Sequence, residues 1–316
     1  MSFKVISFFC IIIVALFSGY CAQKRGWVSR EQSQRISGFM MIYLFPFVII
    51  VSIWKLHISA GLILLPIVGA LTAISTIIPS LIISRIFSFT RNQTGSYVGA
   101  AMLSNVGLTL GAFVCFVLLG EDGLSYALIY ITYFIPFFFT VMFYIASLYS
   151  GVSRPGFGES LKKAFLEPVS LVPNLAIIAG FTLNLAGINR PSFLQSINEF
   201  AIYIANFSFL FACGLTFDFS KMRGYFREAI SILPIKFVFS PLVGLGLVFL
   251  LRLGNVNDTL LLRVIFIESS MPVAVFAMVL PQFFPLDQNL ANSTWIVTTI
   301  GFLFFAPVLV YVLQMI

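Results

Sequence analysis

Two apolar stretches of the sequence carry polar residues whose types and spacing suit ion binding. The stretch at 104–111 reads Ser-Asn-Val-Gly-Leu-Thr-Leu-Gly, and the stretch at 268–274 reads Glu-Ser-Ser-Met-Pro-Val-Ala. Pro272 has no N–H, so in a membrane helix the carbonyl of Glu268 would lose its hydrogen-bond partner, with no water to replace it. This carbonyl, the Glu268 carboxylate and the hydroxyls of the two serines that follow make a candidate all-oxygen cation site.

Ionisable residues inside apolar stretches are functional candidates, because a charge at the centre of a membrane helix costs about 2.5–3.5 kcal/mol. We therefore expect Glu268 to bind or carry a cation, the alternative being a structural ion pair with Arg263 or Lys236. Asn105 lies at a similar depth, and its alternative is a structural interhelical hydrogen bond. The long stem of Lys236 either reaches the headgroups or leaves its ammonium near the site.

Interrupted helices also suit an anionic substrate. The second half of a broken helix directs its partly positive N-terminal end toward the middle of the membrane, where a carboxylate can bind. One structural device would thus serve both a cation and an organic anion. The substrate-binding residues that we expect are Gly107, Thr109, Ser270, Pro272 and Lys236.

The composition excludes most other classes of protein. Of 316 residues, 60% are hydrophobic and only 9% are charged, whereas soluble domains carry about a quarter charged residues. The net charge of +7 comes from Lys and Arg in short connections, where membrane topology explains it, so we predict no nucleic-acid partner. With one His and no paired acidic motif, we predict no enzyme and no cofactor.

The apolar stretches are about twenty residues long, as needed to cross roughly 30 Å of hydrocarbon, and lack the alternation of outer-membrane strands. We predict an all-α polytopic membrane protein with ten transmembrane helices. The predicted spans are Val5–Cys21, Ile36–Trp54, Ile58–Ile83, Tyr97–Leu119, Gly123–Tyr149, Val169–Leu185, Phe193–Phe217, Ala229–Leu251, Thr259–Leu280 and Leu290–Leu313.

The distribution of Lys and Arg predicts the orientation. The first span resembles a signal peptide, but basic residues follow it and disfavour export, so we expect it to be retained. Basic residues gather on one set of connections, which places both termini outside the cytoplasm. The residues on the predicted cytoplasmic side are Lys24, Arg25, Arg30, Arg35, Arg85, Arg91, Arg154, Lys162, Lys163, Lys221, Arg223 and Arg227, against Lys4, Lys55, Arg190 and Arg252 on the other.

The two halves of the chain have similarly spaced spans. We predict a first five-helix repeat at 1–150, a short cytoplasmic connection at 151–167 and a second, inverted repeat at 168–316, an arrangement typical of transporters. Even spacing alone is also expected of any ten-span chain that is divided in half. The predicted helices 4 and 9, which hold the two polar stretches, correspond to each other and are expected to be broken and to cross.

Motifs along nearly the whole chain resemble the auxin efflux carrier family, a ten-span group within the bile, arsenite and riboflavin transporter superfamily. The family's fourth span carries a proline shortly after Asn-x-Gly; here Leu110, Gly111 and Ala112 occupy that place, so a glycine would supply the break. The short central connection means that auxin itself is not implied. The similar motifs are Tyr43-Leu44-Phe45-Pro46, Asn105-Val106-Gly107, Leu118-Leu119-Gly120-Glu121-Asp122-Gly123, Pro173-Asn174, Ile188-Asn189-Arg190-Pro191, Ile235-Lys236 to Pro241, and Met271-Pro272.

Two fragments are similar to the bile-acid/sodium symporter branch, in which the matching residues bind sodium. A threonine four residues before a proline assists in that branch, and Thr132 before Pro136 matches it. The branch's glutamine after the methionine is Pro272 here, so the resemblance implies one sodium site, held by Asn105 and Glu268. The cation-binding residues that it implies are Ser104, Asn105, Thr132, Glu268, Ser269 and Met271.

These observations predict a secondary transporter of the plasma membrane that moves a small organic anion by alternating access, with Na⁺ as the coupling ion. The first alternative is a proton-coupled or uncoupled carrier that exports an organic anion. A further alternative is a sensor or channel on a transporter fold. The expected partners are the organic anion and membrane lipids. The sequence is compatible with a monomer or a homodimer.

Overall fold

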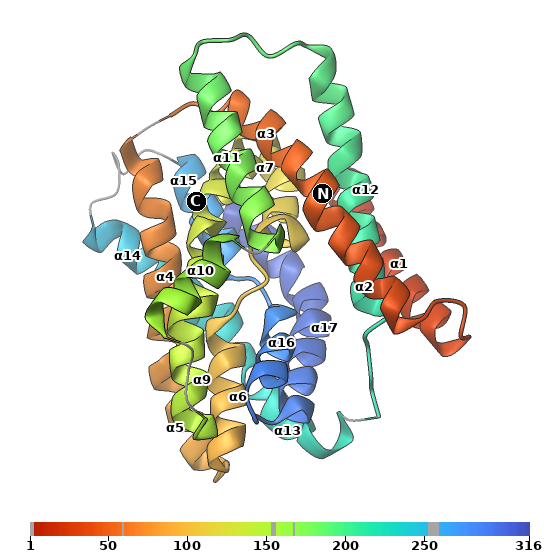
Figure 1. The fold of residues 1–316 in the computed structure, drawn as a ribbon, viewed down its shortest axis with the longest axis vertical. Coiled ribbons are helices and arrows are strands. Elements are labelled where there is room, and N and C mark those ends of the chain that lie inside the picture. Colours follow the sequence, from red (N-terminus) through yellow and green to blue (C-terminus); the bar gives the residue numbers. More distant parts are fainter. Residues whose placement is uncertain (1–2, 59, 153–155, 167, 221, 252–258) are drawn as a thin grey trace. The chain divides into compact units, whose positions relative to one another are not determined.

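The computed structural model describes residues 3–58, 60–152, 156–166, 168–220, 222–251 and 259–316 (Figure 1). The described residues form helices joined by short connections, with one isolated antiparallel bridge between Ser104 and Val273. Arg154, Lys221 and Arg252, which entered the charge comparison, lie outside the described residues. The predicted all-α architecture is therefore confirmed for the part of the chain that the structure describes.

Six segments among these residues are long and apolar enough to cross a membrane. Two shorter apolar helices, Cys10–Lys24 and Leu171–Leu185, accompany them. This confirms a multi-pass membrane protein, whereas the count of ten spans and their inverted repeat remain predictions. The six segments are Glu31–Trp54, Gly61–Ile86, Gly111–Ser150, Phe193–Gly214, Phe226–Leu250 and Gln288–Leu313.

Residue contacts divide the chain into two compact units, each of which draws on both halves of the sequence. The predicted division into 1–150, 151–167 and 168–316 concerns related halves rather than compact units, so it remains a prediction. The first unit comprises Met1–Ser59, Gly107–Leu128 and Phe165–Phe217, and the second comprises Ala60–Val106, Ile129–Ala164 and Asp218–Ile316.

In the first unit, α1 packs along α12, and α3 packs along α11 (Figure 1). Gly19 of α1 and Gly214 of α12 let these two backbones approach closely, because a Cβ at Gly19 would lie 2.1 Å from the carbonyl oxygen of Phe211. The helices of this unit are α1 (Phe3–Lys24), α2 (Arg30–Phe39), η1 (Met40–Leu44), α3 (Phe45–Trp54), η3 (Gly107–Thr109), most of α7 (Gly111–Tyr130), α11 (Pro168–Leu185) and α12 (Phe193–Gly214).

The second unit is built around α6, which packs against α5, α9, α16 and α17. All its residues from Gly95 to Met102 are buried. The helices of this unit are η2 (Ala60–Leu64), α4 (Leu65–Ser75), α5 (Ile77–Ile86), α6 (Arg91–Met102), η4 (Ile131–Tyr133), α8 (Phe134–Phe137), η5 (Phe138–Met142), α9 (Phe143–Ser150), most of α10 (Phe157–Leu166), η6 (Arg223–Tyr225), α13 (Phe226–Ile230), η7 (Ile235–Phe239), α14 (Ser240–Leu250), α15 (Thr259–Ser269), α16 (Phe276–Phe283) and α17 (Gln288–Leu313).

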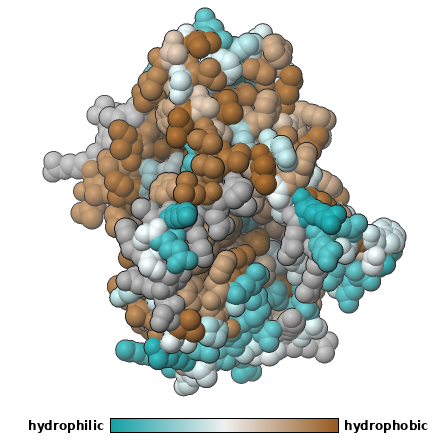
Figure 2. Space-filling view, viewed as in Figure 1, coloured by the Kyte–Doolittle hydropathy of each residue, from teal (hydrophilic) through white to brown (hydrophobic). Residues whose placement is uncertain are grey.

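Large apolar side chains remain exposed on the helices. Phe304 is 78% exposed, Leu250 77% and Ile63 75%. Figure 2 shows apolar side chains over much of the visible face. Contiguous apolar surface of this kind marks a membrane-facing or protein-binding surface, and on apolar helices of spanning length it is the surface that lipid would cover.

Candidate functional site

The first polar stretch interrupts a helix of the second unit. The helix α6 starts with a capping box, in which the Thr90 N–H donates to the Gln93 side chain at 2.9 Å. It ends at Met102, because Leu103 adopts the extended conformation (φ −92°, ψ 105°). Gly107 then has φ +77°, a left-handed conformation that glycine adopts without steric cost. The predicted break is therefore present without the family's proline, but the left-handed glycine is Gly107, whereas Gly111, in the proline's stretch, is the first residue of α7.

The second polar stretch interrupts a helix in the same unit. The helix α15 ends at Ser269, and α16 begins at Phe276. The Ser269 hydroxyl donates to the Ile265 carbonyl at 2.6 Å, and the Ser270 hydroxyl donates to the Phe266 carbonyl at 2.6 Å. Both hydroxyl oxygens keep lone pairs that can accept a hydrogen bond or coordinate a cation.

One expectation about this break needs correction. The sequence predicted that Pro272 would leave the carbonyl of Glu268 without a partner. In the structure the Met271 N–H donates to this carbonyl at 3.4 Å, because the chain tightens into a 3₁₀-like turn before the proline. This hydrogen bond is long and therefore weak, but it gives the Glu268 carbonyl a partner.

The two breaks pair with each other through the isolated antiparallel bridge between Ser104 and Val273. The Asn105 N–H donates to the Pro272 carbonyl at 2.7 Å, and the Ala274 N–H donates to the Leu103 carbonyl at 2.9 Å. The Val273 N–H donates to the Thr298 hydroxyl of α17 at 3.1 Å. Non-helical backbone is tolerated at membrane depth only where its polar groups are satisfied, and these bonds satisfy it here.

Lys236 lies at this pair of breaks. It belongs to η7, a π-helical turn that follows Pro234, and turns of this kind occur often at functional sites. Its side chain is fully buried. Its Nζ donates to the Ala101 carbonyl at 2.6 Å and to the Ser104 hydroxyl at 2.9 Å. Both acceptors belong to the C-terminal end of α6 and the residues that follow it.

Glu268 is fully buried in α15. It lies within electrostatic range of Tyr133. The Nζ of Lys236 donates to Ala101 and Ser104, and among the described contacts the buried Nε of Arg263 has no hydrogen-bond partner.

The predicted site residues divide between the two units. Ser104, Asn105, Thr132, Lys236 and the segment at 268–272 belong to the second unit, whereas Gly107 and Thr109 belong to the first. Hydrogen bonds connect Asn105 with Pro272 and Lys236 with Ser104. The Thr132 hydroxyl donates to the Ile129 carbonyl at 2.8 Å, a local bond within its own turn.

Sequence reasoning missed a run of buried polar residues on α17. The Thr298 hydroxyl accepts a hydrogen bond from the Val273 N–H and thereby satisfies a backbone donor in the second break. The signal was available, since several hydroxyl and amide side chains interrupt an otherwise apolar span. The buried members are Asn292, Ser293, Thr294, Thr298 and Thr299.

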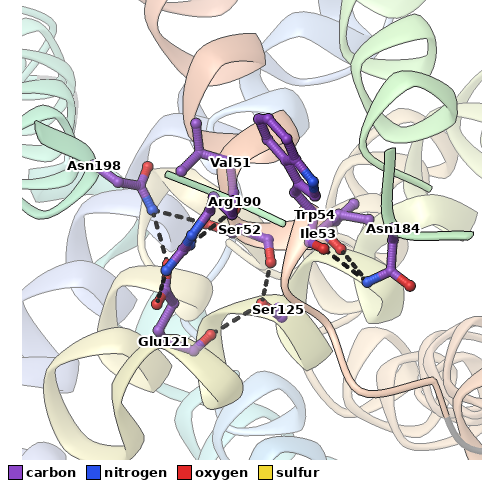
Figure 3. Close-up of polar contacts among 9 residues, drawn as sticks. All are labelled: Val51, Ser52, Ile53, Trp54, Glu121, Ser125, Asn184, Arg190 and Asn198. Carbon is purple, nitrogen blue, oxygen red and sulfur yellow. Dashed lines mark hydrogen bonds and ion pairs between the residues drawn. The ribbon is translucent and has the colours of Figure 1, made fainter. Parts of the chain in front are cut away.

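Sequence reasoning also missed an ion pair in the first unit (Figure 3). Arg190 makes a two-pronged contact with the carboxylate of Glu121, and one of its nitrogens also donates to the Val51 carbonyl at 3.0 Å. The Asn198 amide donates to the Ser52 hydroxyl at 3.1 Å and reaches Glu121 at 3.5 Å. Glu121 follows Gly120, whose φ of +78° turns the chain, so a charge next to a turn glycine was the sequence signal.

The same cluster caps the C-terminal end of α3, where helix carbonyls lack intrahelical partners. Arg190 donates a hydrogen bond to the Val51 carbonyl, and the Ser125 hydroxyl donates to the Ser52 carbonyl at 3.0 Å. The Asn184 amide donates to the Ile53 carbonyl at 3.1 Å and to the Trp54 carbonyl at 2.9 Å. The cluster in Figure 3 therefore has a structural role at the end of α3.

Comparison with known proteins gives consistent matches. The model of the family described as "Membrane transport protein" matches residues 4–151. A protein of Methanocaldococcus jannaschii, named an uncharacterized transporter, is 26% identical over 94% of this chain and 95% of its own length. Another of Methanothermobacter thermautotrophicus, with the same description, is 25% identical over 92% of each chain. These matches agree with the transporter class that the motifs predict: residues 4–151 are similar to the membrane transport family, and more than nine tenths of the chain is similar to proteins named transporters.

Proposed function

We propose that this transporter is a secondary carrier of a small organic anion that works by alternating access and uses Na⁺ as its coupling ion. The observation that carries the proposal is the antiparallel pairing of two interrupted helices beside two fully buried ionisable residues, Glu268 and Lys236. Buried charges inside a membrane protein are costly and are kept where they bind an ion or substrate.

The cation would bind at Asn105 and Glu268. A carboxylate and an amide carbonyl are the hard oxygen ligands that alkali cations prefer, and the hydroxyl oxygens of Ser269 and Ser270 lie next to the carboxylate in sequence. Met271 is fully buried in the same break. Its buried place fits a role in packing around the site rather than a thioether contact with the cation, because hard cations prefer oxygen ligands.

The anion would bind to the positive groups of the same region. The N-terminal end of α16 begins at the second break and carries partial positive charge. Lys236 supplies a full charge at the first break. A substrate carboxylate that binds near both would be neutralised without leaving the protein interior, and alternating access would require the two compact units to move as separate bodies.

The test is thermal unfolding of the detergent-purified protein, titrated with sodium against potassium and choline. A ligand that binds only the folded state raises the unfolding midpoint with concentration. We expect a sodium-specific rise in the wild type that is lost in Glu268→Gln. The matched control is Glu199→Gln, which removes an exposed carboxylate from α12 and should keep the sodium response.

Transport is then measured in vesicles under an imposed sodium gradient, with labelled carboxylates of increasing size. Concentrative, sodium-dependent uptake supports the proposal. Stabilisation by low pH in place of sodium, together with pH-driven uptake, would identify Glu268 as a proton carrier instead. Uptake that only equilibrates across the membrane would refute coupled transport and favour a channel.

A further inference from the structure

We infer that the Lys236 ammonium is a resident cation that fills the ion position at the C-terminal end of α6, so that a dissolved cation binds only at the Glu268 side. This inference rests on the proposed function and deepens it, since it divides the expected cation site into a part that the lysine fills and a part that exchanges. It assigns Ser104 to the lysine rather than to sodium.

The first argument is the chemistry of the contacts. A backbone carbonyl at 2.6 Å and a hydroxyl oxygen at 2.9 Å surround Nζ, and these are the ligand types that a bound alkali cation also uses. Two cations cannot share one hydroxyl at this range without strong repulsion, because the Coulomb energy is largest in a buried, poorly solvated place. While Nζ stays where it is, Ser104 is not available to sodium.

The second argument is the position of the ammonium along α6. Ala101 lies one residue before the end of this helix, and the last carbonyls of a helix carry partial negative charge and lack intrahelical partners. A break inside a membrane exposes such an end where no water can solvate it. A cation fixed to the protein neutralises it without the loss of freedom that binding a separate ion requires.

The third argument concerns the remaining donor of the ammonium. A protonated lysine has three N–H groups, and among the described contacts Nζ has two partners, Ala101 and Ser104. The side chain is fully buried, so the third N–H has no bulk water to bond with. This N–H could therefore donate to a carboxylate of the transported anion. The lysine would then neutralise the substrate's charge, as a metal ion bound beside the substrate would.

The local structure holds the ammonium in place. The π-helical turn Ile235–Phe239 surrounds Lys236, and the Lys236 N–H donates to the Ile232 carbonyl at 3.1 Å. A wider turn repositions the side chains that follow it relative to a regular helix. The stem of Lys236 is buried along with its nitrogen, so the residue packs in one conformation instead of snorkelling to the headgroups.

The experiment is chemical rescue of Lys236→Ala. This variant lacks Cγ, Cδ, Cε and Nζ, and n-propylammonium supplies three carbons and an ammonium of the same shape. The probes are n-propylammonium, 1-propanol as its uncharged counterpart, and sodium, each titrated during thermal unfolding of protein purified in choline buffer. Lys55→Ala is the control, because Lys55 is exposed.

We expect Lys236→Ala to unfold at a lower temperature than the wild type and to recover in a saturable way with n-propylammonium, while 1-propanol has no effect. Sodium should give Lys236→Ala a second stabilisation that the wild type lacks. The wild type and Lys55→Ala should not respond to n-propylammonium. Absence of rescue by both cations would show that the lysine acts only by packing, and the inference would be wrong.

A second measurement keeps the inference testable where Lys236→Ala does not fold. In an otherwise wild-type chain, Ser104→Ala should leave the dependence of the unfolding midpoint on sodium concentration unchanged. Asn105→Ala should shift this dependence to higher sodium concentrations. A loss of sodium affinity in Ser104→Ala would overturn the inference. If the wild type shows no sodium response at all, the proposed sodium coupling fails, but rescue of Lys236→Ala by n-propylammonium still supports the resident cation.

Discussion

Breaking the ion pair between Glu121 and Arg190 should strongly destabilise the first unit. We consider Arg190→Met, which keeps much of the apolar stem but removes the guanidinium. The arginine side chain is 6% exposed and the glutamate side chain 18%, so the variant leaves a carboxylate in a place that water reaches only in part. It also removes the cap of the Val51 carbonyl.

The expected cost follows from these contacts. Removal of one partner of a fully buried ion pair costs about 3–5 kcal/mol. Water solvates part of the remaining Glu121 carboxylate, and Asn198 approaches it only at 3.5 Å, so we lower the expected cost to about 2–4 kcal/mol, including about 1 kcal/mol for the lost carbonyl bond. The double variant Glu121→Gln with Arg190→Met should cost less than the sum of the two single variants, because neither charge is left alone.

The assay is reversible unfolding of the detergent-solubilised protein by denaturant, with the two single variants and the double variant forming a thermodynamic cycle. The control is Arg85→Met, which removes the same group from an exposed position at the end of α5 and should change stability by less than about 0.5 kcal/mol. If Arg190→Met proves no more harmful than Arg85→Met, the pair does not stabilise the fold and our reasoning from burial is refuted.

Two other changes test the second unit. Gly244→Ala should destabilise the protein by about 1–3 kcal/mol, since a Cβ would lie 2.9 Å from the Ser269 hydroxyl, whereas Gly246→Ala on the same helix meets nothing within 4 Å and should be tolerated in denaturant unfolding. Tyr225 donates to the Asp287 carboxylate at 2.6 Å, and this bond raises the pKa of the tyrosine above its usual value. Its contribution to stability should therefore be complete below about pH 10 and should fall as the pH rises toward the raised pKa, and Tyr225→Phe should lack this alkaline loss in pH-dependent unfolding.

The sequence alone determined the class of protein and the places where its helices are interrupted. Long apolar stretches with few charges can satisfy their backbone in lipid only as helices, so the all-helical, multi-pass architecture followed from composition. Pro272 predicted one break because it removes a donor, and the polar residues and glycines of 104–111 predicted the other because they suit an unbroken helix poorly. Motif order predicted the transport family whose model matches residues 4–151.

Only the tertiary structure decided which side chains meet. The pairing of Asn105 with Pro272 joins segments more than 160 residues apart, and no local pattern fixes such a contact. The same holds for Lys236, whose choice between snorkelling and binding at the break depended on the packing of α6, and for Glu121 with Arg190. Where a helix begins, ends or breaks depends on residues close together in the sequence. The partners of buried charges depend instead on how distant helices pack, which the local sequence does not specify.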